Sequence, residues 1–254
     1  MLTDPLFYAI AIPGVLLAGM AKGGFGGALG MLAVPMMALV ISPVQAAAIM
    51  LPILITMDIV GLIAWRGVFD RATIFIIVPA AIVGIAIGWA TAAWVTEAHV
   101  RLIVGIVAVM FTLNYAFGGA DRTQPKPHNR PKGSFWGAVT GFVSFVSHAG
   151  GPPLQMYVLP LRLDPKLFAG TAIICFAVIN AVKVVPYFFL GQFSTANLWT
   201  SAALLPFAPV ATLFGVWLVK RIEPAPFYRI TYAALFVIGL KLIWDGAAAI
   251  VAGL

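Results

Sequence analysis

The stretch VQAAAIMLPILITMDIVGLIAW occupies residues 44–65, and its only ionisable side chain is that of Asp58. About 20 apolar residues cross the roughly 30 Å hydrocarbon core of a bilayer as a helix. This run is too long for a barrel strand and does not alternate as such strands do. Residues 44–65 therefore predict a transmembrane helix with a polar group inside the membrane.

Comparable apolar stretches fill the chain on both sides. They are 5–21, 25–41, 73–95, 100–117, 134–147, 152–161, 166–190, 197–219 and 227–251. The composition agrees, since 62% of the 254 residues are hydrophobic and 9% are charged, whereas about a quarter of the residues in soluble domains are charged. We expect an all-α integral membrane protein, a polytopic helical bundle, and the composition excludes an ordinary cytosolic enzyme.

Basic residues collect in alternate gaps between these stretches. Those gaps carry Arg66 and Arg71, the basic residues of 118–133, Arg162 and Lys166, and Lys220, Arg221 and Arg229. Of the opposite gaps, only the one holding Arg101 is an exception. Because a Lys and Arg excess marks cytoplasmic loops, we expect 118–133 in the cytoplasm and both termini on the other side. The net charge of +7 then reflects topology and not nucleic acid binding.

The two halves of the chain look like weak repeats. Three features recur at matching spacing: 26–35 and 151–160, Ser42-Pro43 and Asp164-Pro165, and Asp58 and Asn180. We therefore expect a first membrane repeat at 1–117, a basic linker at 118–133 and a second repeat at 134–254. Five segments per half, an odd number, would make the repeats inverted, as in many secondary transporters. Each repeat would comprise a Gly-rich broken or re-entrant helical hairpin followed by three transmembrane helices.

Two glycine-rich corners, GMAKGGFGG at 19–27 and HAGGPP at 148–153, interrupt the first apolar pair of each half. Glycine permits positive φ and proline suits a helix start, so each corner predicts a helix, a break and a second helix. Residues 152–161 are too short to cross, which favours a re-entrant hairpin. Its helix N-terminus would offer free amides to an anion. The alternative is tight loops or small-residue helix contacts, but duplication favours a site.

The candidate substrate-binding residues are Lys22, Gly23, Gly24, Gly26, Gly27, His148, Gly150, Gly151, Asn180 and Lys183. Lys22 either supplies a positive charge that binds the anionic substrate or is an ordinary charge on the cytoplasmic side. Lys183 follows Asn180 by one helical step and either neutralises the anion or snorkels to the outer interface. His148 is as suited to binding backbone carbonyls at the corner as to binding substrate.

Asp58 is the acidic residue well inside a span of the first half, where a charge is costly. It is the candidate proton-coupling residue or a hydrogen-bond anchor for the hairpin. The alternative is an interfacial aspartate that pairs with Arg66 or water. Lys241 and Asp245, spaced i and i+4, are expected to neutralise each other.

Ser147 and His148 suggest an intramembrane hydrolase. Sequence neighbours point in different directions on a helix, however, and catalysis needs nucleophile–base contact and an oxyanion hole, so no enzyme is expected. One cysteine, Cys175, and three histidines leave little material for a metal site. No cofactor or metal is expected.

At its corners the sequence resembles the sulfite exporter TauE/SafE family of membrane transporters. The resemblance rests on AKGGFGG at 21–27, the run to Val34-Pro35, HAGGPP at 148–153, and the two-half layout across nearly the whole chain. It implies a transporter in the bacterial plasma (inner) membrane, working as an exporter of a small sulfur-containing anion such as sulfite, sulfoacetate or a related organosulfonate.

The sequence and the resemblance together predict a secondary transporter among membrane lipids, with a proton as candidate coupling ion. A passive anion channel would suit the same corners, and saturable, counterflow-capable flux separates the two. A non-transporting membrane scaffold would leave the duplicated hairpins without a purpose. The oligomeric state stays open, a homodimer included.

Overall fold

The computed structural model describes residues 2, 4–26, 29–92, 94–117 and 124–252, and every regular element within them is helical. The elements are α1 (Pro5–Gly24), η1 (Leu29–Leu32), α2 (Ala33–Met37), α3 (Pro43–Ala64), α4 (Arg71–Ala90), α5 (Glu97–Phe117), α6 (Arg130–Ser147), α7 (Gly151–Val158), η3 (Leu159–Leu161), α8 (Pro165–Phe189), α9 (Thr195–Leu204), α10 (Phe207–Arg221) and α11 (Pro224–Val251). The all-α class predicted from the sequence is confirmed.

Six described helices are long and apolar enough to cross a membrane: α1, α3, α4, α5, α8 and α11. The pair α9 and α10, bent by 45°, adds a seventh if it counts as one span. The bend falls where Pro206 follows Leu205, as expected of a proline that cannot donate within a helix. The chain is thus a multi-pass membrane protein.

The long central helices of the two halves start in the same way. α3 begins at Pro43 behind Ser42, and α8 begins at Pro165 behind Asp164; in both, the side chain of the preceding residue caps a backbone N–H. Proline fits the first helical position because the N–H that it lacks would have had no partner there. The duplicated sequence motifs therefore mark the starts of two helices with the same local design.

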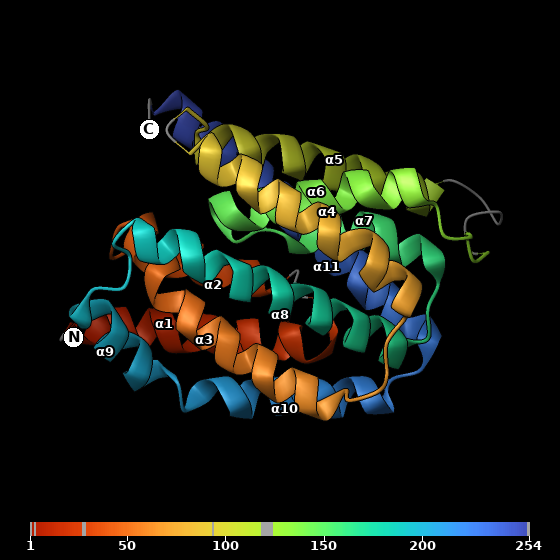
Figure 1. Ribbon diagram of the computed structural model, residues 1–254, viewed down its shortest axis with the longest axis horizontal. Coiled ribbons are helices and arrows are strands. Elements are labelled where there is room, and N and C mark those ends of the chain that lie inside the picture. Colours follow the sequence, from red (N-terminus) through yellow and green to blue (C-terminus); the bar gives the residue numbers. More distant parts are fainter. Residues whose placement is uncertain (1, 3, 27–28, 93, 118–123, 253–254) are drawn as a thin grey trace.

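The two glycine-rich corners break at different points. α1 continues through its glycines to Gly24, and the break comes at Gly26, whose φ is +66°. α6 ends at Ser147, its C-cap His148 is left-handed with φ of 53°, and α7 starts after Gly150. Both α2 and α7 are too short to cross a bilayer. Each half therefore opens with a long helix and a short one that turns back (Figure 1).

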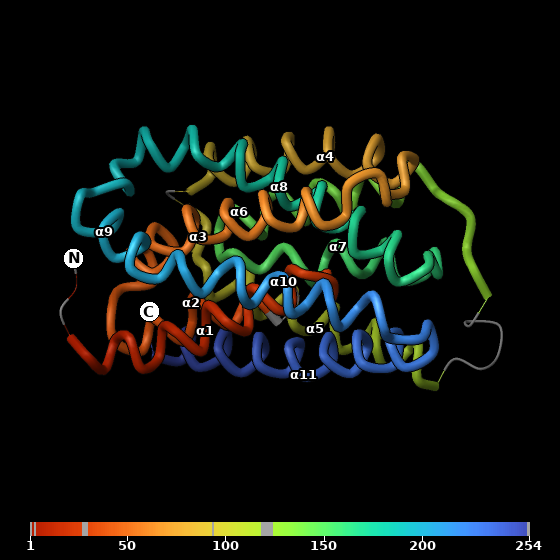
Figure 2. The backbone as a smooth tube through the Cα atoms, turned by 90° about the horizontal axis from the view of Figure 1, so that it is seen from below, coloured from red at the N-terminus to blue at the C-terminus, as the bar shows by residue number. Residues whose placement is uncertain are grey.

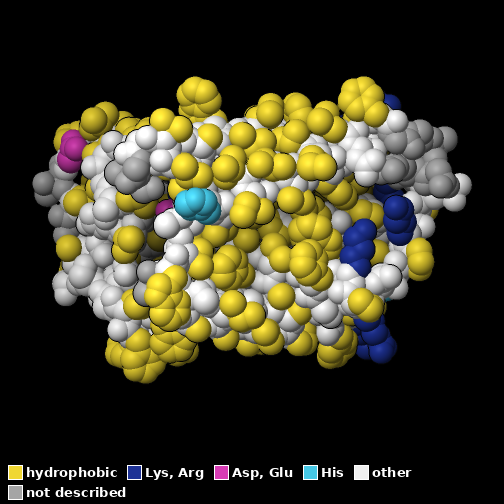
Figure 3. Space-filling model, turned by 90° about the horizontal axis from the view of Figure 1, so that it is seen from above, with side chains coloured by type: hydrophobic (Ala, Val, Ile, Leu, Met, Phe, Trp, Pro, Cys, Tyr) yellow, Lys and Arg dark blue, Asp and Glu magenta, His cyan; other side chains and the backbone are white. Residues whose placement is uncertain are grey.

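The helices run along the long axis of an elongated bundle (Figures 1 and 2). At one end lie the start of α1, the end of α11 and the α2–α3, α4–α5 and α8–α9 connections; we call it the terminal end. The opposite end carries the α3–α4, α7–α8 and α10–α11 connections and residues 124–129. Lys and Arg side chains gather there on the otherwise largely hydrophobic face of Figure 3, and we call it the basic end.

Residues 118–133 were expected to form the linker, and the structure places their last part in a helix. α6 begins at Arg130, with the side chain of Asn129 capping its first turn. Residues 118–123 lie outside the described residues. α6 therefore starts four residues before the apolar stretch at 134–147, because Asn129 and Pro131 together form a good helix start.

Helices pair across the two halves. α1 packs along α10 and α6 along α4, while α3 packs on α8 and α5 on α11. Glycines set the first two contacts: a Cβ on Gly23 would lie 2.3 Å from the carbonyl oxygen of Thr212, and one on Gly141 would lie 1.9 Å from that of Ala81. No side chain fits at these distances, so the backbones approach this closely only through glycine.

Candidate functional site

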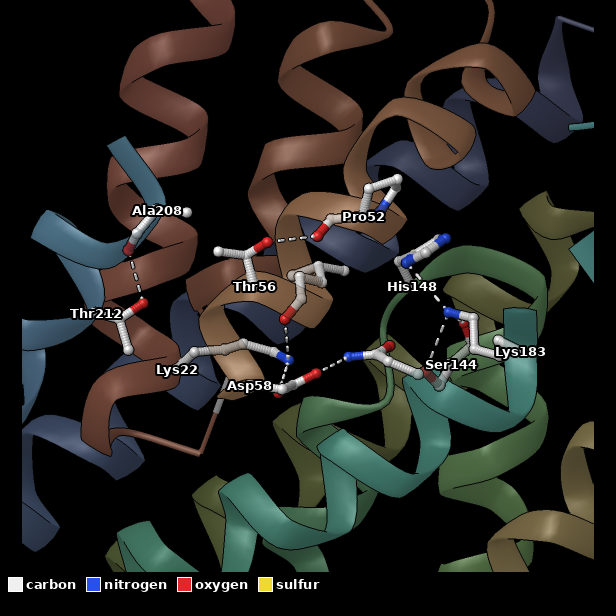
Figure 4. Close-up of polar contacts among 11 residues, drawn as sticks. Lys22, Pro52, Thr56, Asp58, Ser144, His148, Lys183, Ala208 and Thr212 are labelled. Atoms are coloured by element: carbon white, nitrogen blue, oxygen red, sulfur yellow. Dashed lines mark hydrogen bonds and ion pairs between the residues drawn. The ribbon is translucent and has the colours of Figure 1, made fainter. Parts of the chain in front are cut away.

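The buried polar residues of the two halves meet where α3 packs on α8. Asn180 donates from Nδ2 to Asp58 Oδ2 at 2.7 Å, and Lys22 of α1 forms an ion pair with Asp58 Oδ1. Lys22, Asp58 and Asn180 are 6%, 3% and 2% exposed. Figure 4 shows the Asp58 carboxylate beside the Lys22 ammonium. Asp58 thus pairs with Lys22, and the alternative of an interfacial aspartate paired with Arg66 is wrong.

A second group centres on Lys183, one helical step beyond Asn180. Its ammonium donates to the carbonyl oxygen of Ser144 at 2.6 Å and lies 3.1 Å from His148 Nδ1 (Figure 4). His148 Nε2 is in turn 2.6 Å from the hydroxyl of Tyr187. Lys183 is 0% exposed, so it does not snorkel to the interface. Its hydrogen-bond partners are a carbonyl, a hydroxyl and an imidazole, and none of these is an anion.

Two cavities adjoin these groups. The inner cavity, about 30 Å³, is lined by Lys22, Gly30, Met31, Val34, Met50, Leu54, Ser144, His148, Gly151, Phe176 and Asn180. The vestibule, about 240 Å³, is lined toward the terminal end by Pro43, Val44, Ala92, Val95, Glu97, Leu190 and Gln192, with Tyr187 and Phe145 deeper. Val34 and His148 line both. The inner cavity has room for roughly two waters, and His148 lies between it and the vestibule.

Gly23 and Gly24 lie away from the inner cavity. They belong to the last turn of α1 and pack on α10, where a Cβ on Gly24 would lie 2.2 Å from the Val219 side chain. For these two glycines the structure shows the small-residue helix contact that was the alternative to a binding role. Gly27 lies outside the described residues.

Gly26, Gly150 and Gly151 lie at the breaks. A Cβ on Gly26 would meet the Phe168 ring at 2.9 Å, and Gly150 is the N-cap of α7. Gly151 lines the inner cavity. Because the next two residues of α7 are prolines without N–H groups, the amides that α7 can offer there come from Gly150 and Gly151.

Three residues of the site were not singled out from the sequence: Ser144, Tyr187 and Gln155. Helical spacing could have identified Ser144 and Tyr187, because Ser144 precedes His148 by four residues and Tyr187 follows Lys183 by four. Gln155 had no such signal. Its amide donates 2.9 Å to the carbonyl oxygen of Phe25, which joins α7 of the second half to the break of the first.

The remaining polar expectations also have defined positions. Lys241 Nζ lies 2.6 Å from Asp245 Oδ1, which confirms that pair. The Ser147 hydroxyl donates to the Val143 carbonyl at 3.2 Å, whereas His148 contacts Lys183 and Tyr187. Within the described residues no group of three or more His, Cys, Asp or Glu side chains is placed to hold a metal ion.

The cluster as a whole favours binding of an anion. With all three groups ionised, Lys22 and Lys183 bring two positive charges, and Asp58 brings one negative charge. A buried charge without a counter-charge is costly in a low-dielectric interior. An anion in the inner cavity would supply the missing counter-charge.

The family model described as Sulfite exporter TauE/SafE matches residues 11–242 of this chain. The chain belongs to that family. The TauE/SafE family comprises membrane transporters of sulfite and related sulfur anions, so the resemblance seen at the two corners is confirmed. The match includes both breaks and the whole cluster from Lys22 to Tyr187. No curated protein and no solved structure matches the chain.

Proposed function

We propose that this TauE/SafE protein is a secondary transporter that exports sulfite, sulfoacetate or a related organosulfonate and binds it at the inner cavity. The observation that carries the proposal is Lys183, a fully buried lysine bonded to neutral groups beside the Lys22–Asp58 pair. A sulfur oxyanion would neutralise Lys183. His148, Asn180, Gly150 and Gly151 supply the uncharged donors around it.

The inner cavity, with room for roughly two waters, is smaller than such an anion needs. We therefore propose that the described conformation is closed at the inner cavity and that helices part to admit substrate. The vestibule reaches His148 from the terminal end, so we propose that the site opens toward that end.

Asp58 is the proposed proton-coupling residue. Its carboxylate holds Lys22, and a proton on Asp58 would weaken that ion pair. The Lys22 ammonium would then be free to join Lys183 in holding the anion, so that the charge state of Asp58 sets how strongly the site binds the anion. Asn180 keeps Asp58 in place in either state through its hydrogen bond.

The helix pairing supports two inverted repeats. We match α1, α3, α4 and α5 with α6, α8, α9–α10 and α11, in that order. The α1–α10 contact then corresponds to the α6–α4 contact. The α3–α8 contact and the α5–α11 contact each correspond to themselves. The matched residues Asp58 and Asn180 bond each other at the α3–α8 crossing, as expected beside a two-fold axis. Matching helices also run in opposite directions in Figure 1.

We infer a bacterial inner-membrane location with the basic end, including the linker, in the cytoplasm and both termini outside. The vestibule would then face the outside. Alternating access would follow from one repeat rocking against the other around the cluster.

The test compares Lys183→Met with Lys241→Met, an exposed lysine of α11 paired with Asp245. Binding of sulfite, thiosulfate, sulfoacetate, sulfate and chloride is measured on purified protein, and flux is measured in proteoliposomes. Losing a buried charge partner costs at least about 2 kcal/mol, so Lys183→Met should weaken binding of the preferred anion roughly 30-fold or more. Equal affinity in both variants contradicts this site.

The same proteoliposomes separate the other two functions. Flux that saturates and shows counterflow identifies a carrier, whereas flux without counterflow identifies a passive anion channel. A wild-type protein that moves none of the five anions would favour the non-transporting scaffold.

A further inference from the structure

A continuous chain of hydrogen-bonding groups leads from the vestibule to the inner cavity. Tyr187 lines the vestibule, its hydroxyl lies 2.6 Å from His148 Nε2, and His148 Nδ1 lies 3.1 Å from Lys183 Nζ. Each group in the chain both gives and accepts a proton. We propose that Tyr187, His148 and Lys183 form a proton relay between the vestibule and Asp58. This inference rests on the proposed proton-coupled transport.

The relay balances proton by proton. A Lys183 ammonium donates to Nδ1, so Nε2 carries the imidazole proton and donates to the Tyr187 oxygen. When Lys183 gives its proton to Asp58, it becomes an amine. The imidazole then turns over, so that its Nε2–H faces the amine and Nδ1 faces the Tyr187 hydroxyl. Nε2 passes its proton to the amine while Nδ1 takes the Tyr187 proton, and Tyr187 takes one from vestibule water. Asp58 gains one proton, the vestibule loses one, and the other groups regain their charges.

The last transfer, from Lys183 to Asp58, passes beside the inner cavity. Its lining includes Ser144 and His148, which contact Lys183, and Lys22 and Asn180, which contact Asp58. Asn180 lies one helical step before Lys183 and contacts the Asp58 carboxylate, so both ends of this step lie on the same side of α8. The cavity has room for roughly two waters among these contact partners of Lys183 and Asp58.

Other charged groups act on the relay from neighbouring helices. Lys22 of α1 and Asp58 of α3 interact electrostatically with Lys183, and Lys22 also acts on His148. Glu97 of α5 lines the vestibule near Tyr187 and pairs with Arg101. The relay therefore begins beside a carboxylate that attracts protons and ends at a second one.

The left-handed conformation of His148 places its imidazole between the other two groups of the relay, Tyr187 and Lys183. His148 caps α6 with φ of 53°, and this geometry aims its imidazole between α8 residues one turn apart. Neighbouring Ser147, in helical conformation, bonds its own helix instead. The break after α6 thus places one side chain in contact with both cavities.

The experiment uses Tyr187→Phe, which keeps the ring that packs edge-on against Phe145 and removes only the hydroxyl. The matched control is Tyr8→Phe, which removes a hydroxyl bonded to the Leu2 carbonyl at the terminal end. Full-length proteins are reconstituted with a trapped pH dye. Net flux of labelled sulfite, with sulfoacetate in a second series, is compared with exchange of the same anion across the membrane at equal pH.

We expect Tyr187→Phe to slow proton-coupled net flux about 100-fold or more, the lower end of the range for a positioned proton-transferring side chain, while exchange stays at the wild-type rate. Net flux equal to that of Tyr8→Phe overturns the relay, and so does an equal loss of exchange. If Tyr187→Phe does not fold, the wild-type protein in D₂O provides the test. Net flux should slow more than exchange, and equal slowing contradicts the relay.

The controls separate failure of the relay from failure of the proposed function. Wild-type protein that moves anions without moving protons overturns the relay and the proton coupling at Asp58, and leaves anion transport standing. Wild-type protein that moves neither sulfite nor sulfoacetate overturns both.

Discussion

Replacing Lys22 with methionine would leave the Asp58 carboxylate in the middle of the bundle, held by the amide of Asn180. Replacing Asp58 with asparagine would leave the Lys22 ammonium with the Leu54 carbonyl at 3.4 Å, a weak hydrogen bond. Both side chains of the pair are about 95% buried. Each single change therefore leaves a charge in a place that water hardly reaches.

The size of the effect follows from this burial. Removing one partner of a buried ion pair costs roughly 3–5 kcal/mol in free energy of unfolding, because the other charge stays buried. The double variant Lys22→Met/Asp58→Asn carries neither charge. We expect it to be more stable than the sum of the single changes predicts, by about 2–3 kcal/mol.

A double-mutant cycle measures this coupling. Equilibrium unfolding in mixed micelles, followed by tryptophan fluorescence, gives the free energy of unfolding of all four proteins. The matched control is the same cycle on Lys241 and Asp245, an exposed i, i+4 pair. That pair should couple by no more than about 0.5 kcal/mol.

Additive single changes at Lys22 and Asp58, within about 0.5 kcal/mol, would refute the buried ion pair. A coupling no larger than that of the control pair would do the same, because it would mean that water reaches both charges. Either result would also remove the basis for releasing Lys22 by protonation of Asp58.

Two further predictions concern stability. Gly23→Ala and Gly141→Ala should each lower the free energy of unfolding by about 1–3 kcal/mol in the same assay, because each added methyl group forces two packed helices apart. The control is Gly67→Asn, which lies in open space at φ of +78°. An unchanged free energy of unfolding at either Gly23 or Gly141 would contradict the close packing. At the basic end, partial burial raises the pKa of Asp70, but hydrogen bonds from Thr73 and the contact with His128 outweigh it and lower that pKa. A lowered pKa means that the ionised Asp70 stabilises the fold at pH values above the ordinary aspartate pKa, and this stabilisation is lost as the pH falls. The melting temperature of the wild type should therefore exceed that of Asp70→Asn above about pH 4 and approach it below that pH. A difference in melting temperature that stays constant down to the lowest pH would contradict this.

The membrane architecture could be predicted because its causes are local. The apolar run at 44–65 became α3, and its start and that of α8 followed from a capping residue and a proline. The short segment after the second corner became α7 because glycine and two prolines leave the chain little choice there. Segment length, composition and capping act within a few residues, so a single sequence contains them.

The position of the break at the first corner could not be predicted from the local sequence. A run of glycines permits a break anywhere along it, and only packing against α10 decides that Gly23 and Gly24 stay helical and that the chain turns at Gly26. Sequence spacing placed Asp58 and Asn180 at corresponding positions of the two halves but gave no means to know that they touch.

What the sequence determined by itself was the set of helices, the two breaks and the polar residues inside the membrane. Only the tertiary structure decided which polar groups pair: Asp58 with Lys22 and Asn180, and Lys183 with Ser144 and His148. The physical reason is distance along the chain. These partners lie 36, 122, 39 and 35 residues apart, and contacts of that range depend on how whole helices pack against one another.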